Sequence, residues 1–316
     1  MDPYLSIVIP IYNEEENIPA LWERLSRVMA EHFTDPAKPW EIVLTDDGSR
    51  DRSLALLVDI AKAEPRVKVV EFNRNYGQHS AIFGAFAEVR GQIIVTLDAD
   101  LQNPPEEIPK LVAKVEEGYD VVGGWRQGRQ ANDSFFRTMP SKIVNAVTRK
   151  TTGVKLHDYG CMLRAYRRDV VDAMLLCKER SSFIPALANS FAKRITEVPV
   201  AHAERAAGES KYGLWKLINL QFDLLTSFSL LPLQALSVFG VITAAFGFLL
   251  FLGLVVYRFL HPEGTAQGVF TLFAILFFFV GCQFIAFGLL GEYIGRIYQE
   301  VRDRPRYMVK KVHGDR

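Results

Sequence analysis

The sequence predicts an α/β domain, built around a mostly parallel sheet and followed by two membrane-spanning helices. Over residues 1–210, short apolar runs alternate with amphipathic helical patterns, as in sheets that helices cover on both faces. Farther along, the stretches 224–257 and 264–291 contain no Asp, Glu, Lys or Arg. Hydrophobic residues make up 49% of the 316 and charged residues 23%, which fits a charged domain joined to an apolar one.

The first 210 residues contain five predicted strands and four predicted helices. The strands are expected at 5–9, 41–45, 67–72, 93–97 and 119–122. The helices are expected at 18–31, 52–63, 80–89 and 105–117. The first apolar run is short, lacks a basic flank and ends at a proline, so it predicts a strand and not a signal peptide. In such sheets ligands bind beyond the carboxyl ends of the strands.

The remaining residues predict a membrane part. Segment 211–232 mixes apolar side chains with Trp215 and charged residues, which is typical of helices in the bilayer interface, although a plain connector helix has the same pattern. The spans are expected at about 233–257 and 268–291, since about 20 apolar residues cross a bilayer; two buried helices of a soluble bundle are the alternative. The tail 292–316 carries seven basic and four acidic residues, whereas Arg258 is the only basic residue between the spans. The N-terminal domain and this basic tail are therefore both expected to be cytoplasmic.

Composition excludes several functional classes. The net charge of +1 argues against a general nucleic-acid binder, which needs a basic surface. Three scattered cysteines without a CxxC pair indicate neither a disulfide framework nor a zinc site. There is no GxxxxGK[ST] phosphate loop, and the six histidines show no metal-binding spacing.

Polar and acidic residues follow three of the predicted strands, at one edge of the sheet. They are Pro10, Tyr12 and Glu14 after the first, Asp46 and Asp47 after the second, and Asp98, Asp100 and Gln102 after the fourth. Carboxylates that lie close together need a cation, a proton or a polar ligand. The pattern Asp98-Ala-Asp100 supplies hard oxygen ligands suited to Mg²⁺ or Mn²⁺ held together with a diphosphate. Helix capping is the alternative for Asp100, because Asn103-Pro-Pro is a good helix start.

Basic residues form a second group, after the fifth strand and before the membrane part. They are Arg126, Arg129, Arg137 and Lys142, with Ser141 among them, and later Arg205 and Lys211 around Ser210. Guanidinium groups match phosphate oxygens in pairs. Next to a membrane part this pattern favours an anionic lipid headgroup, and a solvated basic face is the alternative.

Several motifs together resemble a known family. Ile9-Pro-Ile-Tyr-Asn-Glu14, Asp46-Asp-Gly-Ser49 and Asp98-Ala-Asp-Leu-Gln102 are similar to family 2 glycosyltransferases of the GT-A fold. The C-terminal strings Gly288–Tyr298 and Arg304-Pro-Arg-Tyr307 resemble bacterial polyprenyl-phosphate glycosyltransferases. The strings 74–81, 158–168 and 208–212 resemble the branch of that family that transfers 4-deoxy-4-formamido-L-arabinose to undecaprenyl phosphate, in lipid A modification and polymyxin resistance.

The resemblance implies a role for each matching residue. The nucleotide would be bound by Pro10, Tyr12, Glu14, Asp46, Asp47 and Asp98, and the divalent cation by Asp98, Asp100 and Gln102. A loop with Arg205, Ser210 and Lys211 would bind the donor diphosphate, and Arg126, Arg137 and Ser141 would bind the lipid phosphate. Asp158 and Asp100 would be the catalytic residues.

The resemblance also implies an inverting, metal-assisted transfer of a sugar from a UDP-sugar to undecaprenyl phosphate at the bacterial inner membrane. It further implies that the protein can form a homo-oligomer. Because a lipid monophosphate is largely ionised at pH 7, no strong base is needed, and we expect Asp158 to orient the acceptor. Transfer of glucose or another hexose is the alternative within the enzyme class. A non-catalytic protein that binds or carries lipid-linked sugars is the alternative outside it.

Overall fold

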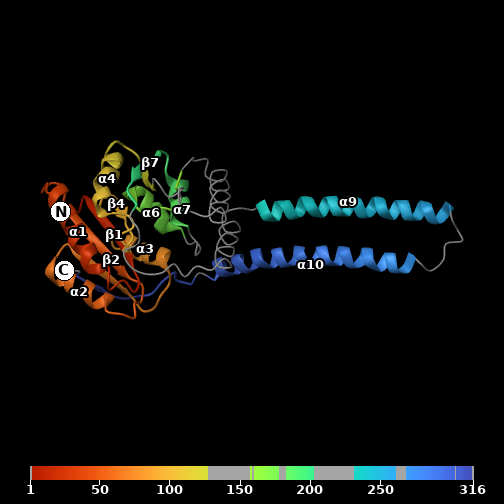
Figure 1. The fold of residues 1–316 in the computed structure, drawn as a ribbon, viewed down its shortest axis with the longest axis horizontal. Helices are drawn as coiled ribbons and strands as arrows, with labels where there is room; N and C mark the ends of the chain where they lie inside the picture. The colour runs from red at the N-terminus through yellow and green to blue at the C-terminus, as the bar shows by residue number, and fades with distance from the viewer. Residues whose placement is uncertain are drawn as a thin grey trace. The chain divides into compact units, whose positions relative to one another are not determined.

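The computed structural model describes residues 2–126, 157–158, 160–177, 183–202, 231–260, 268–302 and 304–314. The chain divides into two compact units. The first comprises residues 1–218 with 304–316 and contains the α/β fold, and the second comprises residues 219–303 and contains two long helices (Figure 1).

The first unit alternates strands and helices as the sequence predicts. Its strands are β1 (Leu5–Ile11), β2 (Trp40–Asp46), β3 (Val67–Phe72), β4 (Ile93–Thr96), β5 (Val121–Arg126), β6 (Arg164–Arg167), β7 (Ile195–Val200) and β8 (Val309–His313). Its helices are α1 (Ile18–His32), α2 (Ser53–Ala63), α3 (Gln78–Phe86), the short 3₁₀ helix η1 (Pro105–Glu107), α4 (Ile108–Glu116), α6 (Arg168–Leu176) and α7 (Ile184–Phe191).

The strands form one mixed sheet in the order β7-β5-β6-β4-β1-β2-β3-β8. The central strands β4, β1, β2 and β3 are parallel to one another, and β5 is parallel to β7. Strand β6 runs antiparallel between β4 and β5, and β8 runs antiparallel to β3. The carboxyl ends of β1, β2 and β4 therefore meet at one edge, which places the residues that follow them together.

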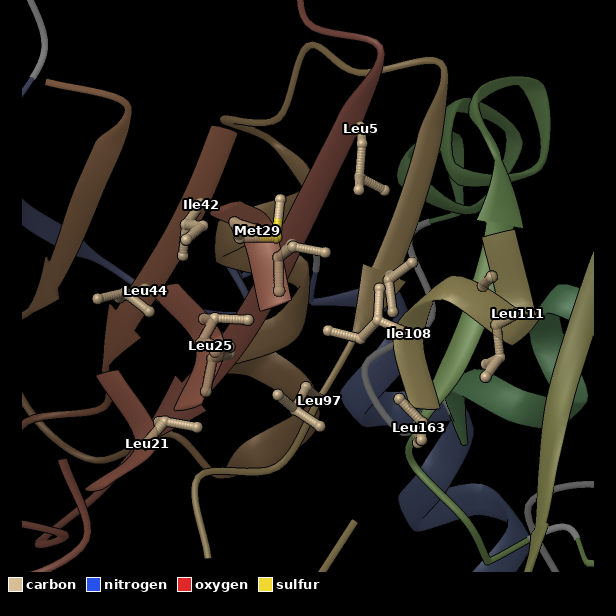
Figure 2. Packing of buried hydrophobic residues seen from close by; sticks show 14 of the residues in the cluster. Leu5, Leu21, Leu25, Met29, Ile42, Leu44, Leu97, Ile108, Leu111 and Leu163 are labelled. Carbon is tan, nitrogen blue, oxygen red and sulfur yellow. The ribbon is translucent and has the colours of Figure 1, made fainter. Parts of the chain in front are cut away.

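Side chains of the central strands alternate between two buried clusters, one on each face of the sheet. In β1, Ile7 and Ile9 belong to the first cluster and Val8 belongs to the second, as the two-residue period of a strand requires. Helices α1, α2 and α4 contribute to the first cluster, part of which Figure 2 shows, with Leu25 of α1 and Leu111 of α4 among the labelled residues. Helices α3, α6 and α7 contribute to the second. The expected α/β architecture of the GT-A type is confirmed.

The segment 292–316, expected to be a basic tail, is divided between two elements. Residues up to Val301 continue helix α10, and residues Val309–His313 form β8 at the edge of the sheet. The sequence Val-Lys-Lys-Val-His does not predict this strand, because it lacks a continuous apolar run. Charged side chains are common on edge strands such as this one.

The second unit contains α9 (Leu231–Leu260) and α10 (Gly268–Val301). Within them the windows Leu233–Leu250 and Phe278–Gly295 have mean hydropathies of 2.0 and 1.5, and none of either window is buried within the protein. Both helices are long and apolar enough to cross a membrane, as predicted. Helix α10 runs ten residues past the expected end at 291, since helical structure can continue beyond the apolar stretch.

Candidate functional site

Two buried aspartates end strand β2. Asp46 and Asp47 have exposed fractions of 1% and 2%. The Asp47 carboxylate accepts hydrogen bonds from the backbone N–H groups of Tyr76 (2.7 Å) and Gly77 (2.8 Å). Oδ2 of Asp46 accepts from the N–H of Ser49 (3.2 Å), whereas its buried Oδ1 has no hydrogen-bond partner among the described residues. Burial raises the pKa of both carboxyl groups, so this end of β2 favours a ligand that donates hydrogen bonds.

The turn after Asp47 depends on a glycine. Gly48 has a φ of +69°, and a Cβ there would lie 2.4 Å from the carbonyl carbon of Arg74. Only glycine allows both the positive φ and this close approach. The motif Asp46-Asp-Gly-Ser49 thus fits the loop at 73–78 directly against the strand end.

A second acidic pair follows β4, at Asp98 and Asp100. The side-chain amide of Gln78, at the start of α3, donates to Oδ1 of Asp98 (2.7 Å). Burial and the nearby charges of Asp100 and Glu14 raise the pKa of Asp98 to about 7, although Arg126 and the hydrogen bond from Gln78 oppose the shift. The structure thus brings together groups from β1, β4 and β5 that the sequence predicted separately.

The donor set after β4 fits a divalent cation. Asp98 and Asp100 offer hard carboxylate oxygens, and their mutual repulsion is the electrostatic condition that a cation relieves. Within the described residues, no group of three or more His, Cys, Asp or Glu side chains could hold a metal ion. Mg²⁺ commonly binds through one or two carboxylates together with substrate phosphates and water, and Asp98 and Asp100 would suffice for that mode of binding.

A nearly buried ion pair joins the end of β5 to residue 158. Nε and Nη2 of Arg126 donate to the two carboxylate oxygens of Asp158, at 2.6 and 2.9 Å. The side chains are 10% and 13% exposed. Burial lowers the pKa of Arg126, but the hydrogen bonds to Asp158, together with the charges of Asp158, Cys161 and Asp98, raise it above its ordinary value. Such a two-point pair fixes the orientation of both side chains.

The other predicted site residues are placed less fully. Pro10 is within β1 beside Thr45 of β2, Tyr12 is 40% exposed, and the carboxylate of Glu14 accepts from Asn17 (2.6 Å). Gln102 contributes its backbone N–H to Asp100 (3.2 Å), and among the described residues no side-chain contact places it as a cation ligand. Arg137, Ser141, Arg205, Ser210, Lys211 and the interfacial segment at 211–230 lie outside the described residues.

Sequence reasoning missed two residues of this region, Gln78 and Glu197. Gln78 lies in the string 74–81 that carried the resemblance, but its contact with Asp98 depends on two loops that meet only in the fold. Glu197 is on β7 and bonds to residues 157 and 158. No local pattern signals that pairing.

The glycosyl transferase family 2 model matches residues 6–175, a range that holds the ends of β1, β2, β4 and β5. The chain belongs to glycosyl transferase family 2. It is therefore a glycosyltransferase, as the motifs predicted. A relative from Klebsiella pneumoniae named undecaprenyl-phosphate 4-deoxy-4-formamido-L-arabinose transferase is 55% identical over 310 residues, which cover 98% of this chain and 93% of the relative. The protein of the same name from Photorhabdus laumondii is 56% identical, with coverages of 98% and 94%.

A solved structure supports the fold of this family 2 member. Glucosyl-3-phosphoglycerate synthase from Mycobacterium tuberculosis superimposes with a TM-score of 0.50 at 19% identity, over 72% of this chain and 79% of that one. At this identity the likeness concerns the fold alone.

Proposed function

We propose that this glycosyltransferase transfers 4-deoxy-4-formamido-L-arabinose from a UDP-linked donor to undecaprenyl phosphate, in lipid A modification at the cytoplasmic face of the bacterial inner membrane. The observation that carries the proposal is 55–56% identity, over 98% of the chain, to relatives named for this transfer. Two apolar helices of spanning length agree with an acceptor that stays in the bilayer.

The acidic edge of the sheet supports a nucleoside diphosphate donor. Asp46 and Asp47, buried at the end of β2, would receive hydrogen bonds from the nucleoside. Asp98 and Asp100 would hold Mg²⁺ or Mn²⁺, which supplies positive charge to the departing diphosphate. Gln78 fixes the Asp98 carboxylate through its amide.

The ion pair of Arg126 with Asp158 supports an orienting role for Asp158. Both of its carboxylate oxygens accept from Arg126, and this two-point contact stabilises the ionised form. Arg126 bonds to Asp158 through Nε and Nη2, which leaves the Nη1 side of its fork for a lipid phosphate. Because that phosphate is already an anion at pH 7, holding it in line with the anomeric carbon is the main task of these residues.

A donor comparison tests the proposal. The full-length protein in detergent, with undecaprenyl phosphate and Mn²⁺, is given UDP-4-deoxy-4-formamido-L-arabinose, UDP-glucose or UDP-GlcNAc, and lipid-linked product is measured. We expect product with the formamido sugar alone. Product from UDP-glucose would assign the chain to hexose transfer, and the absence of product with every donor would overturn the proposed reaction.

A further inference from the structure

His157 lies next to the Arg126–Asp158 pair and is held in place from two sides. Its Nδ1 is 2.9 Å from Oε2 of Glu197, and its ring stacks on that of Trp125 with centroids 4.5 Å apart and planes 21° apart. Its side chain is nevertheless 66% exposed, whereas that of Glu197 is 6% exposed. An exposed imidazole with a fixed orientation has lost rotamer freedom before any ligand arrives.

The Glu197 carboxylate accepts hydrogen bonds from both residues 157 and 158. Besides the imidazole, its carboxylate accepts the backbone N–H groups of His157 (2.6 Å) and Asp158 (3.0 Å). On the other side of the turn, Nη2 of Arg164 donates to the carbonyl oxygen of Asp158 (3.0 Å). Residues 157 and 158 are therefore anchored to β7 and β6 at the same time.

The bond to Glu197 decides which ring nitrogen of His157 is offered to a ligand. A carboxylate partner holds the proton on Nδ1. No hydrogen bond to Nε2 is present among the described residues. The exposed nitrogen then accepts a hydrogen bond when the ring is neutral and donates one when it is protonated.

We propose that His157 binds the phosphate of the lipid acceptor through Nε2, as a residue positioned by Glu197 and Trp125. The proposal rests on the proposed function and extends it. A phosphate oxygen can accept a hydrogen bond from Nε2 of a protonated ring, and a phosphate O–H can donate one to Nε2 of a neutral ring. The guanidinium group of Arg126 pairs with Asp158, the residue after His157, so a cation lies one position along the chain.

Binding to the full-length protein in detergent tests the proposal without turnover. The probes are a short-chain prenyl monophosphate, the matching prenol and inorganic phosphate, measured by calorimetry for the wild type and for His157→Ala. We expect His157→Ala to weaken binding of the prenyl phosphate about tenfold or more, the loss of one hydrogen bond to a charged group. The Kd for UDP should change less than about twofold, because the acidic edge is untouched.

Two further variants separate binding from folding. His157→Gln keeps an amide that can reach the phosphate, and we expect it to restore part of the affinity. Glu197→Gln should also weaken binding of the prenyl phosphate, since it removes the carboxylate charge and leaves one accepting oxygen for Nδ1 and two backbone N–H groups. His32→Ala, at the exposed last turn of α1, is the matched control and should bind like the wild type. If Glu197→Gln does not fold, the variants at the exposed His157 still test whether this residue binds the prenyl phosphate.

Unchanged binding of the prenyl phosphate to His157→Ala would overturn the proposal, and so would an equal loss of UDP affinity, which would indicate a structural role. If His157→Ala lost affinity for inorganic phosphate alone, the ligand of His157 would be free phosphate and not the lipid. If the wild type transfers no sugar yet binds prenyl phosphate through His157, the proposed function fails and the binding site stands.

Discussion

Asp98 carries an electrostatic cost in the protein without a cation. Its pKa is raised to about 7 by burial and by the charges of Asp100 and Glu14, against an ordinary value near 3.9 in an unfolded chain. The folded state therefore holds its proton over a range of pH in which the unfolded state has released it. Stability from this group is full below about pH 4 and is lost as the pH rises toward 7.

Asp98→Asn should abolish the loss of folding stability that the wild type shows as the pH rises from about 4 to about 7. Asparagine keeps the oxygen that accepts from Gln78 and carries no charge. We expect its Tm to exceed that of the wild type by about 3 °C or more at pH 8 without divalent cation, and to match it at pH 4.5. Thermal unfolding at the two pH values measures this, and equal Tm values at pH 8 would contradict the electrostatic account. Mn²⁺ should stabilise the wild type and not the variant.

Arg126→Lys should reduce kcat/KM for the lipid acceptor about 10- to 100-fold. Lysine preserves the charge but cannot make the two-point contact with Asp158. The Asp158 carboxylate and the phosphate of the lipid acceptor are then no longer held by the same side chain. Steady-state kinetics with varied acceptor check this. Arg24→Lys is the control, because Arg24 makes the same two-point contact with Glu106 on a different part of the surface. If both variants are equally active, the ion pair has no part in acceptor use.

At the scale of elements, β8 and the residues just before it are fastened to β3 and α3. The ring of Tyr307 stacks on Phe72 of β3 at 4.8 Å, and its hydroxyl donates to the carbonyl oxygen of Phe83 in α3 (3.4 Å). Lys310 and His313 both bond to Glu71. Since α3 begins with Gln78, the C-terminal segment supports the same helix that reaches Asp98.

Tyr307→Ala should lower the free energy of unfolding of the first unit by about 2 kcal/mol, from lost stacking and lost apolar contact. Tyr307→Phe keeps the ring and should lose about 0.5 kcal/mol or less. Denaturant unfolding of the two variants provides the comparison. Equal values would mean that the hydroxyl, and not the ring, fastens the segment.

The elements differ in how well the sequence predicts them. Strands β1 to β4 were predicted within two residues, because fully buried parallel strands are continuous apolar runs. Strand β6 reads Arg-Ala-Tyr-Arg and was missed, since Nε and Nη2 of the buried Arg164 donate to carbonyl groups that only the fold supplies. The contacts of Gln78 with Asp98 and of Glu197 with His157 join residues 20 and 40 positions apart, beyond the reach of any local pattern.

At the scale of the whole molecule, the chain combines an α/β unit with two helices whose described side chains are mostly exposed. Apolar helices of 30 and 34 residues that are not buried in protein need another apolar surrounding. A lipid bilayer provides it, and it also contains the proposed acceptor.

We therefore expect the protein to remain in the membrane pellet after an alkaline carbonate wash and to dissolve in detergent. Immunoblots of the fractions measure this, with a peripheral membrane protein as the washed control. Release by carbonate would contradict two spanning helices.

The pairing of β8 with β3 has a consequence for how the protein is made. The ribosome completes β3 at residue 72 and β8 at residue 313, so the edge of the sheet stays open while both long helices are synthesised. A chain that stalls or is cut within those helices presents β3 with unpaired backbone groups, a surface that favours aggregation. The edge at β3 is therefore covered only in chains that have been synthesised as far as residue 313.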